Sequence, residues 1–157
     1  MFVENLLGDI TKLRKPIIQD SVYWGVGSEL VTGREVTFIP NTEHSTKLKE
    51  LQNDQQTIYW SIENKENSQY IGNTSVYANT PKQSEIHILL SNPNYKGKEI
   101  SIEVISLVLN YLKYKAKISE VIINIEQKNQ IMIKVLETIG FNLKSSSDNI
   151  LTYHTIV

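Results

Sequence analysis

The sequence predicts an α/β (α+β) fold: a single domain in which one mixed, mostly antiparallel sheet is flanked by helices. The chain has 157 residues, enough for one sizeable core and too few for two ordinary ones. Strand-like apolar runs fill its middle, and helical periodicity begins at Ile100. The later order of strand, helix, strand, helix predicts one parallel pair of strands with a right-handed crossover.

The composition excludes several classes of function. The 16 basic and 17 acidic residues leave a net charge of -1, and arginine occurs only at Arg14 and Arg34. Because the reading of base edges relies on the arginine fork, no nucleic-acid partner is expected. The chain has no cysteine, which removes thiolate nucleophiles and cysteine-based metal sites. It also lacks an HExxH motif, so no metal cofactor is expected.

A soluble, cytoplasmic protein without membrane association is predicted from the hydrophobicity of the chain. No stretch approaches the roughly 18 apolar residues that span a bilayer. The first residues lack the basic and then apolar order of a signal peptide.

The first third of the chain gives the weakest pattern. A short helix is predicted over residues 2–13, and residues 21–40 are typical of extended chain because glycines interrupt Val, Tyr and Trp. Within that segment VTFIP, residues 36–40, predicts a short strand. Asn41 or Thr42 can then cap a helix.

The middle of the chain predicts a three-strand meander. Its β-branched and aromatic runs are residues 57–63, 69–78 and 84–91, joined by polar turns. Six aromatic residues gather in the first half, and core packing is the first explanation for each of them: Tyr23, Trp24, Tyr59, Trp60, Tyr70 and Tyr77.

The last third alternates between helices and strands. A strand is predicted over residues 121–126, and a second helix begins after Asn129 and ends at Gly140. Residues 141–157 predict a final pair of strands around a polar turn. The preceding amphipathic helix has its apolar side formed by Ile100, Val104, Ile105, Val108 and Leu112.

The connection NYKGKEIS, residues 94–101, has a physical signature of its own. A strand that ends in a tight turn and continues into a helix leaves several backbone N–H groups unpaired and aimed at one point. The helix dipole favours negative charge at the same point. The segment is therefore either a phosphate-binding loop or a simple link between strand and helix.

Two motifs and the order of elements resemble the GNAT superfamily of acetyl-CoA-dependent N-acetyltransferases, closest to the ribosomal-protein and N-terminal acetyltransferase subgroup. NYKGKEIS resembles the family's pyrophosphate loop, and NQIMIKVLETIGF, residues 129–141, resembles its closing signature. One helix and one strand separate the motifs, as in the family. The resemblance covers residues 34–157 and implies a GNAT-like fold whose central parallel pair splays.

This resemblance implies that acetyl-CoA is the co-substrate. The pyrophosphate would bind the backbone around Gly97, the pantetheine arm would lie beside the end of the strand at Leu90, and Asn129 would contact the same arm. The residues implied to bind the cofactor are Leu89, Leu90, Ser91, Lys96, Gly97, Lys98, Glu99, Ile100, Ser101 and Asn129.

The sequence also departs from the family pattern. Lys96 replaces the usual Arg, and Glu99 replaces a Gly at a place where a carboxylate would repel a diphosphate unless its side chain turns outward. Leu136 occupies the position where many members have a Tyr that protonates the departing thiolate. Met132 stands where the N-terminal acetyltransferase subgroup often has a Ser.

The catalytic candidates lie on the strand SEIHILLS. Alternation places Glu85 and His87 on one face, and family members often use a Glu on this strand as the general base. Glu85 is thus the first choice and His87 the second. The competing interpretations are a solvated strand residue for Glu85 and a hydrogen-bonded structural histidine for His87. His44 and His154 are expected to be ordinary surface residues.

The predicted function is the direct transfer of an acetyl group from acetyl-CoA to a primary amine of a small molecule or protein N-terminus. The alternative is a catalytically degenerate module that binds coenzyme A or a partner without turnover. Residues 34–157 would form the acetyltransferase domain. Residues 1–33 would be an N-terminal extension that serves as a lid or as a contact in a homodimer.

Overall fold

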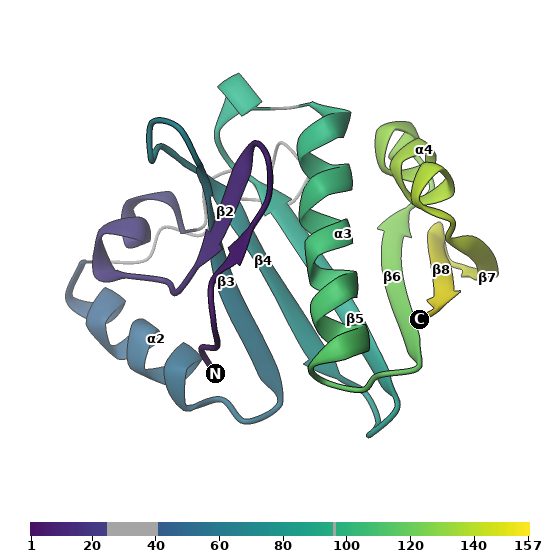
Figure 1. Ribbon diagram of the computed structural model, residues 1–157, viewed down its shortest axis with the longest axis horizontal. Helices are drawn as coiled ribbons and strands as arrows, with labels where there is room; N and C mark the ends of the chain where they lie inside the picture. Colours follow the sequence, from purple (N-terminus) through teal and green to yellow (C-terminus); the bar gives the residue numbers. More distant parts are fainter. Residues whose placement is uncertain (25–40, 96) are drawn as a thin grey trace.

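One mixed sheet organises the molecule (Figure 1). The computed structural model describes residues 1–24, 41–95 and 97–157. Among these residues, eight strands are hydrogen-bonded in the order β1-β2-β3-β4-β5-β6-β8-β7. The elements are β1 (Leu6–Leu7), β2 (Thr11–Arg14), η1 (Ile18–Tyr23), α2 (Asn41–Asn53), β3 (Thr57–Asn64), β4 (Tyr70–Ala78), β5 (Gln83–Leu90), η2 (Pro93–Tyr95), α3 (Lys98–Tyr114), β6 (Glu120–Glu126), α4 (Gln130–Ile139), β7 (Asn142–Ser147) and β8 (Ile150–Ile156).

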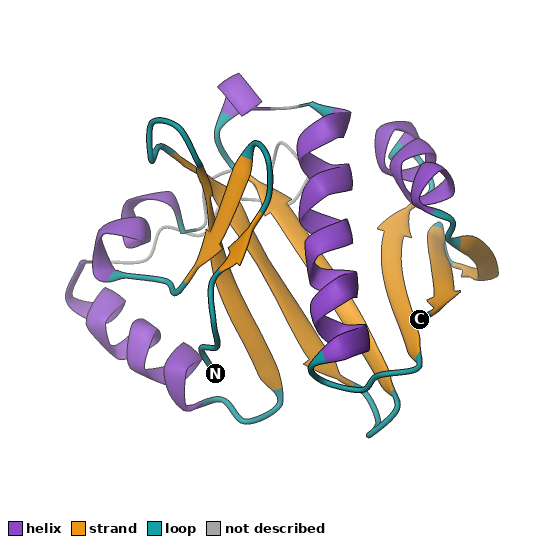
Figure 2. Cartoon of the chain, viewed as in Figure 1, coloured by secondary structure: helices purple, strands orange, loops and turns teal. Residues whose placement is uncertain are grey.

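The strand directions agree with the predicted topology. Every neighbouring pair in the described sheet is antiparallel except β5 and β6, which are parallel and connected through α3. Figure 2 shows this crossover helix in front of the strands. The α+β fold class, the three-strand meander and the two closing strands are thus confirmed.

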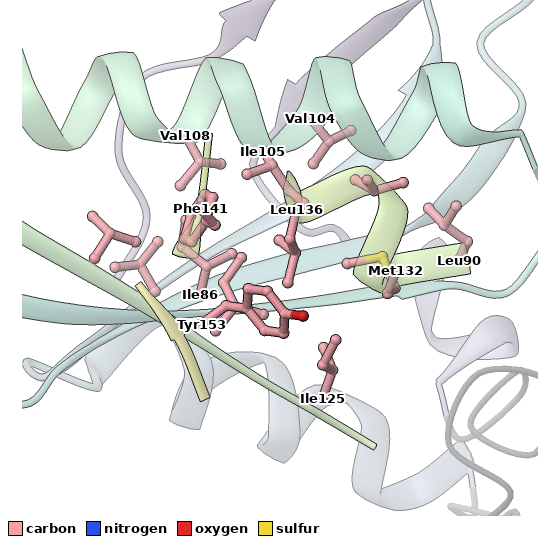
Figure 3. Close-up of a cluster of buried hydrophobic side chains, with 14 of the residues drawn as sticks. Ile86, Leu90, Val104, Ile105, Val108, Ile125, Met132, Leu136, Phe141 and Tyr153 are labelled. Atoms are coloured by element: carbon pink, nitrogen blue, oxygen red, sulfur yellow. The ribbon is translucent and has the colours of Figure 1, made fainter. Parts of the chain in front are cut away.

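Helices α3 and α4 cover one face of the sheet and enclose the main core (Figure 3). The predicted apolar side of α3 is buried, including Val104 and Val108 at 0% exposure. From α4, Leu136 is equally buried, and on the strands Ile86 and Ile123 point to the same side. The alternating buried residues of β6 and the predicted apolar side of α3 therefore meet in one core.

The ends of α4 follow the capping chemistry that its sequence carries. The side chain of Asn129 accepts a hydrogen bond from the backbone N–H of Met132 at 3.2 Å. Gly140 ends the helix with a φ of 107°, a left-handed conformation that favours glycine. These two residues fix both limits of the helix.

On the opposite face of the sheet, η1 covers β2 and β3. The indole of Trp60 contacts Tyr111 of α3 edge-on at 5.4 Å, whereas the next residue, Ser61, faces the other way and bonds to Asp20 of η1 at 2.6 Å. Consecutive strand residues point to opposite faces, so η1 lies across the sheet from α3. Over β5, β6 and β8 the same face carries exposed side chains such as His87 and Asn124.

The predicted helix over residues 2–13 is wrong, because this segment forms the hairpin of β1 and β2. Leu13 pairs with Ile62 of β3 and is fully buried. The turn is fixed by the carboxylate of Glu103 on α3, which accepts hydrogen bonds from the N–H groups of Asp9, Ile10 and Thr11. Tertiary pairing and this distant acceptor thus override the local helical pattern.

The predicted extended segment over residues 21–40 is only partly described. Its start belongs to the 3-10 helix η1, because the Asp20 carboxylate accepts from the Ile17 N–H at 2.9 Å and holds the turn. The remainder, with the predicted strand at residues 36–40, lies outside the described residues. The following helix is confirmed as α2.

Two further features bear on the predicted organisation. Strands β1 and β2, within residues 1–33, are part of the sheet, and the role of that segment as a lid or dimer contact stays a prediction. No helix within the described ranges is long and apolar enough to cross a membrane.

Candidate active site

The parallel pair β5–β6 splays halfway along its length. The register runs from Gln83 opposite Glu120 to Glu85 opposite Ile122 and then stops, although both strands continue. In Figure 1 the two strands start together and diverge towards their carboxyl ends. The splay that the family resemblance implied is therefore present.

The open edge of β5 offers backbone groups to a ligand. The Ser91 N–H donates to the Ile71 carbonyl at 2.9 Å, and the His87 carbonyl accepts from Thr74 Oγ1 at 2.8 Å, so both groups point towards β4. Because backbone direction alternates along a strand, the N–H and C=O groups of Ile88 and Leu90 point the other way, into the splay. Unpaired strand groups of this kind can bind an extended amide chain as a further strand would.

The amino end of α3 adjoins the end of β5 through η2. Gly97 is its N-cap residue in an extended conformation, and a glycine has no side chain with which to cap the helix. Ile100 and Ser101 are buried, whereas Lys98 and Glu99 are exposed. Lys96 lies outside the described residues. The first backbone N–H groups of α3 lie at this end of the helix, and their role in binding a pyrophosphate stays a prediction.

Glu99 occupies the place that the sequence marked as a conflict. Its carboxylate oxygen would lie 2.8 Å from a Cβ added at Gly97, so the side chain folds back over the N-cap. A carboxylate at a helix N-terminus interacts favourably with the helix dipole. A bound diphosphate would compete for the same N–H groups and displace this side chain.

The two catalytic candidates lie together on the open face of β5. His87 Nε2 is 3.3 Å from Glu85 Oε1, and the side chain of His87 is 59% exposed compared with 18% for Glu85. Glu85 also accepts a hydrogen bond from the amide of Asn124 at 3.0 Å. The carbonyl of that amide accepts from the Thr152 hydroxyl at 2.6 Å, which sets the direction of the Asn124 side chain.

Asn124 and Thr152 are site residues that the sequence did not single out. Asn124 lies on β6 beyond the last backbone pair, so its bond to Glu85 spans the two parallel strands where they begin to separate. A signal existed in VIINIE, since Asn124 interrupts an apolar strand on the face opposite Ile123 and Ile125. Its partner could not be found without the register between β5 and β6.

The remaining predicted cofactor residues have structural roles as well. The side chain of Asn129 caps α4, Leu90 is buried in the core, and Ser91 is bonded to Ile71 of β4. Leu136 and Met132 belong to α4, and both side chains are buried on the side of the helix that faces the core. Figure 3 shows these two side chains among the core residues, so this face of α4 supplies no acid there.

A neighbouring polar cluster surrounds Glu120 at the start of β6. The carboxylate contacts Lys144, Gln83 and His154, with Lys144 Nζ at 2.5 Å and His154 Nδ1 at 3.0 Å. These partners, Lys144 foremost, lower the pKa of Glu120 to about 2. His154 is therefore paired and not an ordinary surface residue.

A second histidine prediction is also wrong. His44 is buried, and its ring contacts Trp24 edge-on at 5.8 Å between ring centres. Among the six aromatic residues, Trp60 and Tyr70 are buried, while Tyr23 and Tyr77 are partly exposed on the face that carries Glu85. Within the described residues no group of three or more His, Asp or Glu side chains could hold a metal ion.

The family of the chain follows from its sequence together with this geometry. The family model described as the acetyltransferase (GNAT) domain matches residues 13–142. The chain therefore belongs to the GNAT acetyltransferase family, and its class of reaction is acyl transfer. No curated protein matches the chain in sequence.

Solved structures share the whole fold at low identity. The GNAT-family acetyltransferase from Bacillus anthracis superposes with a TM-score of 0.80 at 13% identity and covers 98% of both chains. Spermidine N-acetyltransferase from Vibrio cholerae, in complex with CoA and spermine, gives 0.79 at 13% identity over 95% of this chain and 96% of that chain. Ribosomal-protein-S5-alanine acetyltransferase from Vibrio fischeri gives 0.77 at 14% identity over 98% and 97%. At such identities the likeness shows the fold.

Proposed function

We propose that the chain moves an acetyl group from acetyl-CoA directly to a primary amine of a small molecule or a protein N-terminus. The observation that carries this proposal is the splay of β5 and β6 together with the amino end of α3, whose N-cap residue is Gly97. Backbone pairing between the two strands ends at Glu85, so the open edge of β5 begins beside the two ionisable side chains and leads towards the amino end of α3.

The residues of the chain fit coenzyme A in two places. The N–H groups at the start of α3, from Gly97 to Ser101, would hold the diphosphate, with Lys98 contributing positive charge nearby. The backbone edge of Ile88 to Leu90 would hold the amide groups of the pantetheine arm. Acetyl-CoA supplies the acetyl thioester when bound, and the solved structure of the spermidine N-acetyltransferase mentioned above contains CoA.

Glu85 is the proposed general base. An attacking amine must lose a proton as the new C–N bond forms and the C–S bond breaks, and a carboxylate can accept that proton directly or through water. His87 is more exposed and lies 3.3 Å from Glu85, so it can pass the proton towards solvent. Asn124 and Thr152 keep the carboxylate in place.

The alternative function is a module that binds coenzyme A or a partner without turnover. Leu136 stands where many relatives have an acidic Tyr, and Glu99 covers the N-cap of α3. A thiolate leaving group would then have to take its proton from water or another side chain. The missing acid at position 136 weakens catalysis without weakening binding, and the Glu99 side chain competes with the diphosphate; the first of these is why a module that binds without turnover is retained.

A thiol-release assay tests the proposal. The purified chain is mixed with acetyl-CoA and, in turn, peptides with free N-termini, polyamines, amino sugars and aminoglycosides. We expect free coenzyme A to accumulate with one class of amine, with the acetylated amine detected by mass. Coenzyme A binding in calorimetry without release for any amine would favour the binding module instead.

A further inference from the structure

Tyr95 connects the proposed cofactor loop, which is the connection between β5 and α3, to a turn that is distant in sequence. It is the last residue of η2 and lies just before the N-cap of α3. Its hydroxyl donates to Gln69 Oε1 at 2.8 Å and accepts from the Asn67 side-chain amide at 3.1 Å. Both partners belong to the turn between β3 and β4, 26 and 28 residues earlier in the chain.

This turn is fixed by its own hydrogen bonds. The side-chain oxygen of Asn64 accepts from the N–H groups of Glu66 and Asn67 at 2.9 and 3.1 Å. The side-chain oxygen of Asn67 accepts from the Gln69 N–H at 3.0 Å, and Ser68 adopts a left-handed φ of 60°. The turn therefore presents the amides of Asn67 and Gln69 in defined positions.

The rest of the loop is held at a different place. The N–H groups of Ser91 and Asn92 both donate to the Ile71 carbonyl, and the Asn92 side chain donates to the Tyr70 carbonyl at 3.0 Å. The Tyr95 N–H then donates to the Asn92 carbonyl. These bonds fix the beginning of the loop on β4, whereas the Tyr95 hydroxyl fixes a point two residues before Gly97.

We propose that the β3–β4 turn is a support for the cofactor loop, and that Tyr95 is the positioning residue through which it acts. The proposal rests on the proposed function, because it concerns the same diphosphate site. Backbone N–H groups bind a diphosphate well only when they already converge on it, since ordering a loose loop costs binding free energy. The turn keeps the start of α3 in that arrangement before the ligand arrives.

Calorimetry with coenzyme A tests this proposal without knowledge of the acceptor. The variants are Tyr95→Phe, which retains the ring and removes the hydroxyl, Gln69→Met, which removes its acceptor, and the double variant. Tyr114→Phe, an exposed tyrosine at the far end of α3, is the matched control. Thermal unfolding of each variant without ligand is measured alongside.

We expect Tyr95→Phe and Gln69→Met each to bind coenzyme A about 3- to 10-fold more weakly, consistent with the loss of one or two hydrogen bonds. The double variant should lose no more than the stronger single loss, because both changes break the same link. Tyr114→Phe should bind as the wild type does.

The outcomes separate the two proposals. Wild-type binding with unchanged affinity in Tyr95→Phe, even if its unfolding temperature falls, would show a merely structural tyrosine and overturn the support role. Additive losses in the double variant would also contradict it, because Gln69 would then act by another route. A wild-type chain that binds no coenzyme A would overturn the proposed function first and the support role with it.

Discussion

Two carboxylate clusters lie on the same face of the sheet and differ in how completely they are enclosed. The enclosed cluster consists of Arg14, Asp20 and Glu63. Asp20, a residue of η1, is 3% exposed, and Arg14 donates to both of its oxygens, at 2.8 and 2.9 Å. Asp20 Oδ2 also accepts from the Ile17 N–H and the Ser61 hydroxyl, and Arg14 Nε donates to Glu63. These carboxylates raise the pKa of Arg14 above its ordinary value.

The cluster at the splay is open by comparison. Glu85 Oε1 has Asn124 and His87 as partners, and no described residue bonds to Oε2. His87 is more than half exposed. The two clusters are therefore suited to different roles. A buried carboxylate that accepts four hydrogen bonds stabilises the fold, whereas one with an oxygen that no described residue bonds, at an open site, can accept a proton from a substrate.

The largest effect is expected at the open cluster. Glu85→Gln should lower kcat/KM by about 10²- to 10⁴-fold, because the amide keeps the shape and removes the base. Thiol release measures this loss, and coenzyme A affinity should not change. Glu126→Gln, on the same face of the neighbouring strand, is the control and should retain activity. Equal turnover in Glu85→Gln would remove Glu85 from the mechanism.

The enclosed cluster should respond in stability. Arg14→Met leaves Asp20 and Glu63 without their main partner in a buried place, which costs about 3 to 5 kcal/mol. Denaturant unfolding measures the change. Lys12→Met removes a more exposed cation 4.0 Å from Glu63 and should cost less than about 1 kcal/mol. Similar losses of unfolding free energy in Arg14→Met and Lys12→Met would contradict the stabilising role of the enclosed cluster.

A smaller loss of activity is expected when the hydrogen bonds that hold Glu85 in place are weakened. In Thr152→Val the hydroxyl that orients Asn124 is lost, and kcat should fall about 3- to 10-fold with an unchanged KM for acetyl-CoA, as expected for one hydrogen bond. Thr152→Ser keeps the hydroxyl and should restore the rate. If the serine variant were as slow as the valine variant, the methyl group and not the hydrogen bond would be responsible.

The smallest effect concerns pH and the Glu120 cluster. Its contacts lower the pKa of Glu120 from the ordinary 4.5 to about 2, so the folded state favours the ionised carboxylate. This stabilisation is complete above about pH 5 and is lost as the pH falls towards 2. Thermal unfolding should therefore separate wild type from Glu120→Gln at neutral pH and bring them together near pH 2. A difference in unfolding temperature that stays constant from neutral pH to about pH 2 would contradict the lowered pKa of Glu120.

The sequence predicted most of the second half of the fold for physical reasons. The helical period from Ile100 was a strong signal because the helix buries one apolar side, and the compact apolar run at residues 121–126 indicated a strand. Alternation alone also placed Glu85 and His87 on one face, where they are in contact. Their roles in catalysis stay predictions.

Other features depended on contacts that no local pattern reveals. The hairpin of β1 and β2 forms because β3 and Glu103, both distant in sequence, supply its partners. Asn124 and Thr152 join Glu85 only through the registers of β6 with β5 and β8. The proposed role of Tyr95 likewise depends on its hydrogen bonds with Asn67 and Gln69, which are distant from it in sequence. Long-range pairing decides each of these cases.

The central claim is that the splay and the amino end of α3 bind acetyl-CoA with its thioester next to Glu85. A crystal structure with coenzyme A tests this most directly. We expect the pantetheine along Ile88 to Leu90, the diphosphate at the N–H groups that follow Gly97, and the Glu99 side chain turned outward. Coenzyme A bound elsewhere, or a thiol on the helix-covered face away from Glu85, would contradict it.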